Sequence, residues 1–156
     1  MTSSTPSKIT GPELADAVSR HDVRVRFCET DLMGIVHHAN YLVYFEAARV
    51  DYLHKRGISY DAWTREGIHL PVVRAGLRYK KAARFDDRLV VEARCAEITR
   101  VTVTFAYRVM RGEDLLCEGD TMLACVSDKL DPKRLPPGII AAFRSAEVPP
   151  SAWAHG

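Results

Sequence analysis

The sequence predicts an α+β fold in which a five-stranded, curved antiparallel sheet wraps around one long central helix. One strand-like segment, Asp22 to Cys28, precedes a long segment of helical period, Val36 to Arg56. Four further strand-like segments then follow with short connections between most of them. Because a single long helix cannot bury itself and a sheet needs a cover on one face, we expect the two to pack against each other.

The size and composition of the chain indicate one domain. The chain has 156 residues, of which 47% are hydrophobic and 27% charged, and its formal net charge is +2. Such a small charge does not point to nucleic acid as the main partner. We expect a flexible or partly helical arm over residues 1–20, the folded domain over 21–127, and a tail with a short helix over 128–156.

Two features predict a cytoplasmic protein without a membrane partner. No apolar run reaches the roughly 18–20 residues that span a bilayer, and the first residues lack the apolar core of a signal peptide. The four cysteines lie in strand-like segments without CxxC spacing, which is typical of buried reduced thiols rather than disulfides or a zinc site. They are Cys28, Cys95, Cys117 and Cys125.

The first strand and the helices are indicated by the spacing of apolar residues. β-Branched residues alternate between Asp22 and Cys28, and from Val36 to Arg56 apolar residues recur every three or four positions. That helix is apolar around much of its girth, so we expect it to be more buried than a usual surface helix. Gly57 would end it, and Tyr60 to Glu66 predicts one short helix more.

The remaining strands alternate apolar and polar residues, as antiparallel strands with one buried face do. Short turns join the later strands into adjacent hairpins, so we expect a four-stranded meander. The predicted strands are His69–Lys81, Arg88–Ile98, Val101–Met110 and Asp114–Val126. A brief helical stretch, Ile139 to Ser145, follows a Pro-rich segment.

The junction between the first strand and the long helix carries the chemistry that we expect. It holds a carboxylate, Asp31, then Gly34, and then His37 and His38 beside the predicted first turn of the helix. The unpaired N–H groups and the positive end of the helix dipole favour developing negative charge. A carboxylate beside such a site is suited to acyl transfer.

This layout resembles the hotdog-fold acyl-CoA thioesterases, in particular the 4-hydroxybenzoyl-CoA thioesterase/YbgC-like branch. The resemblance covers roughly Val23 to Pro136. The residues that carry it are Thr30-Asp31, Gly34-Ile35-Val36, His38-Ala39-Asn40-Tyr41 and Phe45-Glu46-Ala47-Ala48-Arg49. The resemblance implies a thioesterase that hydrolyses acyl-CoA thioesters to free acid and coenzyme A, with coenzyme A present only as part of substrate and product. It also implies a homo-oligomer, at least a dimer and preferably a tetramer, with active sites at the interface.

By this resemblance, Asp31 is the catalytic carboxylate, acting either as a nucleophile on the thioester carbonyl or as a general base on water. A backbone N–H near His38 would bind the thioester oxygen, and the His38 side chain would aid hydrolysis. Some members carry a tyrosine where this chain has Phe27. The surrounding shell of the site would consist of Gly34, His37, Ala39, Asn40 and Tyr41.

Other residues have supporting or competing interpretations. Arg100 matches a place where relatives present basic residues to coenzyme A, and Lys81 and Arg84 are further candidates for binding its phosphates. Glu46 is the reserve carboxylate, although pairing with Arg49 one helical turn later is the favoured interpretation. No metal site is expected, because the adjacent residues His37 and His38 point in different directions on a helix.

Four alternatives stay open from the sequence. Asp31 could be only a turn or helix cap, without chemistry. The substrate could be an acyl-carrier-protein thioester, or the protein could bind acyl-CoA without turnover. A hotdog enoyl-CoA hydratase or dehydratase is the fourth, but its Asp-x-Asn-Pro-x-His pattern would place a histidine where this chain has Val36.

Overall fold

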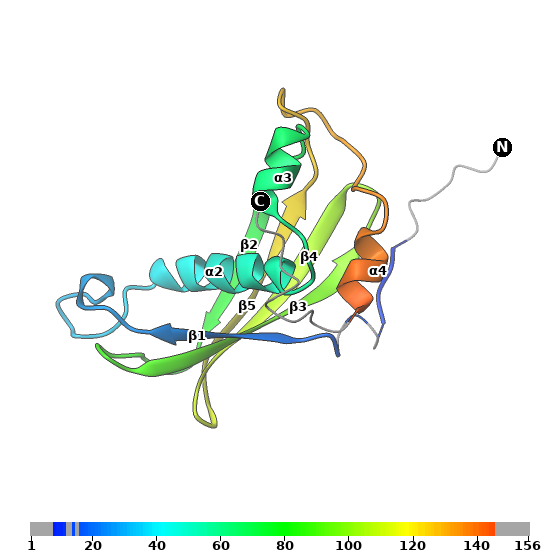
Figure 1. Cartoon of the computed structure of the whole chain (residues 1–156). Helices are drawn as coiled ribbons and strands as arrows, with labels where there is room; N and C mark the ends of the chain where they lie inside the picture. The colour runs from blue at the N-terminus through cyan, green and yellow to red at the C-terminus, as the bar shows by residue number, and fades with distance from the viewer. Residues whose placement is uncertain (1–7, 12–13, 15, 146–156) are drawn as a thin grey trace.

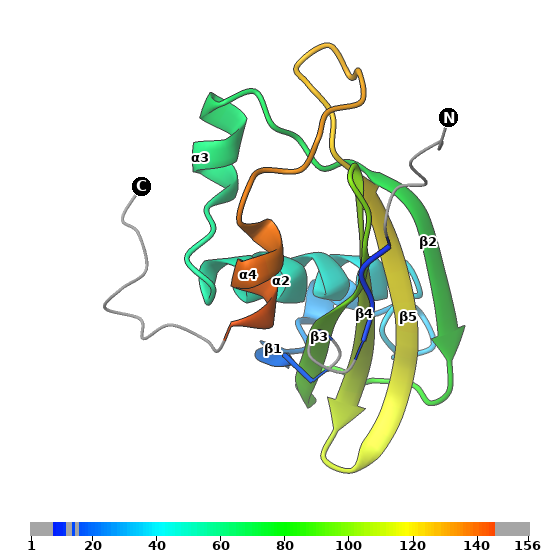
Figure 2. The ribbon, with the colours of Figure 1, turned by 90° about the vertical axis from the view of Figure 1, so that its right-hand side faces the viewer.

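The computed structural model describes residues 8–11, 14 and 16–145, and it has the predicted five-stranded antiparallel sheet around one long helix (Figure 1). The strands are β1 (Ser19–Arg24), β2 (Val72–Tyr79), β3 (Arg88–Ile98), β4 (Thr102–Arg111) and β5 (Asp114–Ala124). The helices are α2 (Asn40–His54), α3 (Tyr60–Arg65) and α4 (Ile139–Arg144), with a short 3-10 helix η1 (Phe27–Glu29). Figure 2 shows α2, α3 and α4 on the same side of the curved sheet.

The strand order is β1-β3-β4-β5-β2, and it corrects the predicted four-stranded meander. The meander comprises β3, β4 and β5 only, whereas β2 pairs antiparallel with β5 at the far edge. The tight turns after β3 and β4 force neighbouring pairing. The longer connection over residues 80–87 lets the chain cross from β2 at one edge of the sheet to β3, which lies beside the opposite edge strand β1.

The first strand lies earlier in the chain than predicted. β1 runs from Ser19 to Arg24, paired with β3, and residues 27–29 form η1 instead of extending the strand. The predicted strand over residues 22–28 is therefore wrong in its second half, and Cys28 is exposed rather than buried. Ile9 forms a bridge with Ile98, which ties part of the predicted arm to the sheet. The rest of the arm, residues 1–7, 12, 13 and 15, lies outside the described residues.

Helix α2 begins at Asn40, four residues later than predicted, and the chain passes Gly57 in the left-handed conformation as expected. One face packs on the sheet through Tyr41, Tyr44, Phe45, Ala48, Arg49, Tyr52 and Leu53, all buried. On the opposite face Leu42 and Val43 are exposed. The sequence predicted a helix buried around much of its circumference. Within one chain, α2 is buried on one face only.

The core between α2 and the sheet is built on aromatic rings. Phe45 stacks on Tyr107 of β4 with ring centroids 4.3 Å apart. The buried Arg49 donates a 3.0 Å hydrogen bond to the Tyr107 hydroxyl. Arg49 thus bonds to the sheet and not to Glu46, which is exposed on α2. The predicted Glu46–Arg49 pair is wrong because position 49 faces the sheet and position 46 faces away.

Candidate active site

Asp31 lies in a tight turn that joins η1 to the segment before α2. The Asp31 N–H donates to the carbonyl of Ile35, and the Gly34 N–H donates to the carbonyl of Asp31, each at 2.9 Å. Gly34 has φ +75°, a left-handed conformation that glycine adopts without a steric penalty. Thr30 and Val36 form a bridge across the base of the turn. These bonds hold the Asp31 backbone in one orientation.

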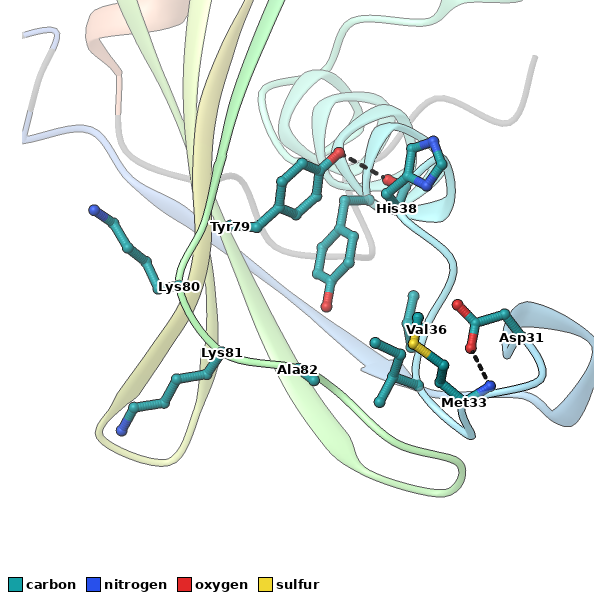
Figure 3. A pocket seen from close by; sticks show the side chains of 10 residues that line it. Asp31, Met33, Val36, His38, Tyr79, Lys80, Lys81 and Ala82 are labelled. Atoms are coloured by element: carbon teal, nitrogen blue, oxygen red, sulfur yellow. Dashed lines mark hydrogen bonds between the residues drawn. The ribbon is translucent and has the colours of Figure 1, made fainter.

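The Asp31 carboxylate is bonded on one oxygen only. Its Oδ1 accepts the N–H of Met33 at 2.8 Å (Figure 3). Among the described residues no other hydrogen bond or ion pair to this carboxylate is present. Asp31 is half-buried. One oxygen is therefore held by the turn, and the other is available to a substrate or a water molecule.

A cavity of about 300 Å³ lies between this turn and the end of strand β2. Its wall is largely apolar and aromatic, with Asp31, His38 and two lysines as the polar groups. The lining residues are Asp31, Met33, Ile35, Val36, His38, Tyr41, Tyr79, Lys80, Lys81 and Ala82. An apolar cavity with a few polar groups at one side is the usual form of a small-molecule site.

The backbone N–H of His38 is a free donor at the site. The neighbouring N–H groups are taken, because His37 donates to the Glu29 carbonyl and Asn40 to the His37 carbonyl. No described residue accepts a hydrogen bond from the His38 N–H. The sequence placed this donor in the first turn of the helix, but His38 precedes Ala39, the N-cap of α2. The His38 N–H is nevertheless next to the start of α2, which is the positive end of the helix dipole.

The two histidines have different positions. Their rings stack with centroids 4.1 Å apart, and the Nδ1 atom of His37 accepts the N–H of Ala39 at 3.2 Å. Both histidines are exposed, but only His38 lines the cavity. No group of three or more His, Cys, Asp or Glu residues suited to a metal ion occurs in the described part of the chain.

Glu29 is a structural residue of the site that the sequence did not single out. Its backbone carbonyl accepts both the His37 N–H at 2.8 Å and the Asn40 side-chain amide at 2.9 Å. Its buried carboxylate accepts bonds from the Arg26 backbone and the Tyr44 hydroxyl. The sequence contains one signal for Glu29, its position two residues before Asp31. In an extended chain, residues two apart point to the same side, so Glu29 and Asp31 would share a side.

The predicted coenzyme A residues separate into two groups. Lys81 lines the cavity together with Lys80, which was not among the predicted coenzyme A residues. Lys81 forms an ion pair with Asp114 at 2.9 Å. Figure 3 shows both lysine side chains extending away from Asp31. Arg84 does not line the cavity, but its backbone bridges to Ile35 in the Asp31 turn.

Arg100 lies in the turn between β3 and β4, at the end of the sheet away from the Asp31 turn (Figure 1). It lines a different cavity, next to Arg134 and the start of α4. Within one chain, therefore, the structure does not bring Arg100 or the exposed Glu46 to the Asp31 cavity. Of the predicted shell, Gly34 forms the turn, Tyr41 lines the cavity, and Ala39 and Asn40 begin the helix.

The fold and this site define a protein of the hotdog thioesterase type, and comparison with known proteins agrees. Residues 33–118, more than half of the chain, match the Thioesterase superfamily model. The chain belongs to the Thioesterase superfamily. The matched segment includes His38 and begins two residues after Asp31.

Among curated proteins, the chain is similar to two YbgC proteins. It is 36% identical to the acyl-CoA thioesterase YbgC of Haemophilus influenzae, over 78% of this chain and 90% of that protein. It is 32% identical to the acyl-CoA thioester hydrolase YbgC of Escherichia coli O6:H1, over 80% of this chain and 95% of that protein.

Among solved structures, the DHNA-CoA thioesterase of Staphylococcus aureus superposes with a TM-score of 0.77 at 31% identity, over 81% of this chain and 88% of that one. A hypothetical protein of Thermus thermophilus, TT1821, superposes with a TM-score of 0.75 at 40% identity, over 81% and 95%. These likenesses confirm the predicted hotdog fold. Among the described residues no helix is long and apolar enough to cross a membrane.

Proposed function

We propose that this protein is an acyl-CoA thioesterase, which hydrolyses an acyl-CoA thioester to the free acid and coenzyme A. The observation that carries the proposal is that a carboxylate with one available oxygen, Asp31, and a residue with an unpaired backbone N–H, His38, line one apolar cavity. The thioesterase names of the YbgC relatives support the same activity.

The geometry suits the two demands of thioester hydrolysis. The His38 N–H would donate a hydrogen bond to the thioester oxygen as negative charge develops on it in the tetrahedral intermediate, and loss of one such donor typically costs about 3 kcal/mol of barrier. Asp31 would supply the attack. As a nucleophile, it would form a mixed anhydride and release the coenzyme A thiolate, and water would then cleave the anhydride. As a general base, it would take a proton from the water that attacks the carbonyl directly.

We assign the acyl group to the apolar part of the cavity and the coenzyme A portion to its lysine rim. Met33, Val36 and Tyr41 would contact the acyl group, and Lys80 and Lys81 would lie near the phosphates. The reaction needs no cofactor, because coenzyme A enters and leaves as part of substrate and product. We therefore expect a chelator to leave the rate unchanged.

The test is thiol release from short, medium, long and aromatic acyl-CoAs, measured with wild-type protein and Asp31→Asn. Asp61→Asn, which removes an exposed carboxylate of α3, is the matched control. We expect release by wild type and by Asp61→Asn and a loss of at least about 100-fold in Asp31→Asn. Release that survives in Asp31→Asn would remove Asp31 from its role and direct the search to Glu46 and His38.

The other candidate functions give different results in the same series. If the protein hydrolyses an acyl-carrier-protein thioester but no acyl-CoA, the substrate carries its acyl group on a carrier protein instead of coenzyme A. The proposed mechanism of thioester hydrolysis then still applies. Loss of the double-bond absorbance of an enoyl-CoA without thiol release would indicate a hydratase. Tight acyl-CoA binding without turnover in every acyl class would indicate a binding module.

Isotopic labelling tests the nucleophilic role of Asp31. In a single turnover in H₂¹⁸O, a nucleophilic Asp31 whose anhydride is opened at the Asp31 carbon retains ¹⁸O, and the acid carries an unlabelled oxygen. A general base, like an anhydride opened at the acyl carbon, places ¹⁸O in the acid and none in Asp31, so label found in Asp31 establishes the nucleophilic role. Mass spectrometry of the peptide that contains Asp31 reads the difference.

We further propose that the protein is at least a dimer, with a tetramer preferred. The edge strand β2 is exposed over most of its length, and apolar residues such as Val73 on β2 and Val43 on α2 are more than half exposed. Natural sheet edges of this kind are usually covered or paired. Light scattering on the purified protein checks the proposal, and a monomeric mass would contradict it. Cytoplasmic location stays a prediction from the sequence.

A further inference from the structure

The Tyr79 hydroxyl joins the end of strand β2 to the loop that presents the free N–H. Tyr79 is the last residue of β2, and its hydroxyl donates a 3.0 Å hydrogen bond to the backbone carbonyl of His38 (Figure 3). Its ring meets the Tyr41 ring edge-on, with centroids 5.4 Å apart. The side chain is 51% exposed, so it is not needed to fill the core.

This bond completes the restraint of the two peptide groups that flank the Cα atom of His38. The peptide between residues 37 and 38, which carries the free N–H, is held at its carbonyl by the Asn40 N–H at 2.9 Å. The next peptide is held at its N–H by His37 Nδ1 and at its carbonyl by Tyr79. Of these contacts, only Tyr79 reaches the loop from the sheet.

We infer that Tyr79 is a positioning residue for catalysis, whose hydroxyl fixes the orientation of the His38 N–H toward the substrate carbonyl. The inference rests on the proposed thioesterase function. A donor that is aligned before the reaction stabilises the developing oxyanion without reorganisation. Without the hydroxyl the His38 peptide would sample orientations that do not point at the oxyanion, and the effect would fall on the chemical step rather than on ground-state binding.

The test compares Tyr79→Phe with Tyr52→Phe. The matched control also loses a hydroxyl that donates to a backbone carbonyl, that of Phe143, but it lies in the core away from the cavity. Because the phenyl ring of Tyr79→Phe keeps the apolar cavity wall, we expect kcat to fall about 3- to 10-fold with KM changed less than about twofold. In Tyr52→Phe we expect kcat to stay at the wild-type value at temperatures well below unfolding.

A second readout does not depend on turnover. Hydrogen–deuterium exchange of a peptide over residues 37–42 reports on the Asn40 N–H, which is bonded to the His37 carbonyl. We expect this N–H to exchange at least about threefold faster in Tyr79→Phe and at the wild-type rate in Tyr52→Phe.

The outcomes separate the two proposals. Unchanged kcat in Tyr79→Phe, or a higher KM at unchanged kcat, would overturn the catalytic role of the hydroxyl. Unchanged exchange would overturn the restraint itself. If wild-type protein hydrolyses no thioester, the proposed function and the catalytic role fall together, and exchange still decides whether Tyr79 restrains the His38 loop.

Discussion

The hydroxyl of Tyr44 donates a 2.9 Å hydrogen bond to Oε1 of Glu29, and this bond ties helix α2 to the turn that leads into Asp31. Glu29 is only 6% exposed, and its carboxylate also accepts the backbone N–H of Arg26 at 2.8 Å. Its backbone carbonyl meanwhile holds His37. One buried residue thus connects the beginning of the site, the helix and the segment that carries the free N–H.

Removing the Tyr44 hydroxyl should destabilise the protein more than removing an equivalent hydroxyl elsewhere. Tyr44→Phe takes one partner from a buried carboxylate, so we expect a loss of about 1.5–3 kcal/mol in the free energy of unfolding. Tyr52→Phe takes a bond from a neutral carbonyl, and about 1 kcal/mol is expected. Urea unfolding measures both. A Tyr44→Phe effect no larger than that of Tyr52→Phe would contradict the role assigned to Glu29.

Glu29 should also contribute to acid denaturation. Burial by itself raises the pKa of Glu29, but the hydrogen bonds from Arg26 and Tyr44 outweigh it and hold the pKa below its usual value. A pKa that is lower in the folded state gives stability that is present above the unfolded pKa of about 4.3 and lost as the pH falls through the folded pKa. Between about pH 5 and pH 3 the Tm of wild type should therefore fall more steeply than that of Glu29→Gln. Parallel curves of Tm against pH would refute this.

Gly34 should matter for activity beyond its effect on stability. Gly34→Ala places a side chain at φ +75°, at a cost of about 1–2 kcal/mol, and strains the turn that carries Asp31. Gly112→Ala, at φ +59° in the β4–β5 turn, is a control with similar strain and an open surrounding. We expect similar losses in Tm but a fall in kcat of about 10-fold in Gly34→Ala alone. Equal activity in both variants would mean that the turn does not orient Asp31.

Gly119 is required by the close approach of three elements. A Cβ atom there would overlap the Gly76 carbonyl oxygen of the neighbouring strand and lie 2.9 Å from the Phe45 ring of α2. We expect Gly119→Ala to cost about 3 kcal/mol or more, measured by urea unfolding. In Gly76→Ala the nearest atom, 3.3 Å away, belongs to the exposed side chain of Asp120, which can move, so a loss below about 1 kcal/mol is expected.

The four cysteines should differ in reactivity, which also bears on the thiol-release assay. Burial raises the pKa of Cys95 to about 12 and that of Cys117 to about 11, and it raises the pKa of Cys125 as well. Cys28 is exposed. Native protein should therefore react with a thiol dye at one cysteine per chain and at four after unfolding. Cys28→Ser should abolish the native reaction and supply the background for the enzyme assay; rapid native labelling in that variant would contradict the burial of the other three.

Much of the fold followed from local patterns. The alternation in residues 88–98 identified β3 with its bounds and its buried face, because a half-buried strand needs an apolar side chain at every second position. The helices near residues 60 and 139 and the glycine after α2 were likewise readable from capping and period. Family motifs then located Asp31 and His38, and the structure places both on one cavity.

The pairing of β2 with β5 could not be read from the sequence, because alternation specifies a face but not a neighbour. The start of α2 was also misjudged: Val36 and Ala39 fit the helical period, yet Val36 donates to the Ala83 carbonyl. That long-range bond outweighs local propensity. Arg100 was assigned to coenzyme A binding only from the resemblance to the family. Its distance from the cavity depends on which end of the β3–β4 hairpin faces the Asp31 turn, and the sequence does not specify this.

The sequence by itself determined that an antiparallel sheet surrounds one helix and that a carboxylate precedes that helix, since periodicity and turn residues are local properties. Only the tertiary structure decided what reaches the site from elsewhere. Glu29 became a buried support through Tyr44, and Tyr79 came to hold the His38 carbonyl from 41 positions away. The Tyr79 contact depends on the position of β2 at the edge of the sheet beside β5, which no local pattern encodes.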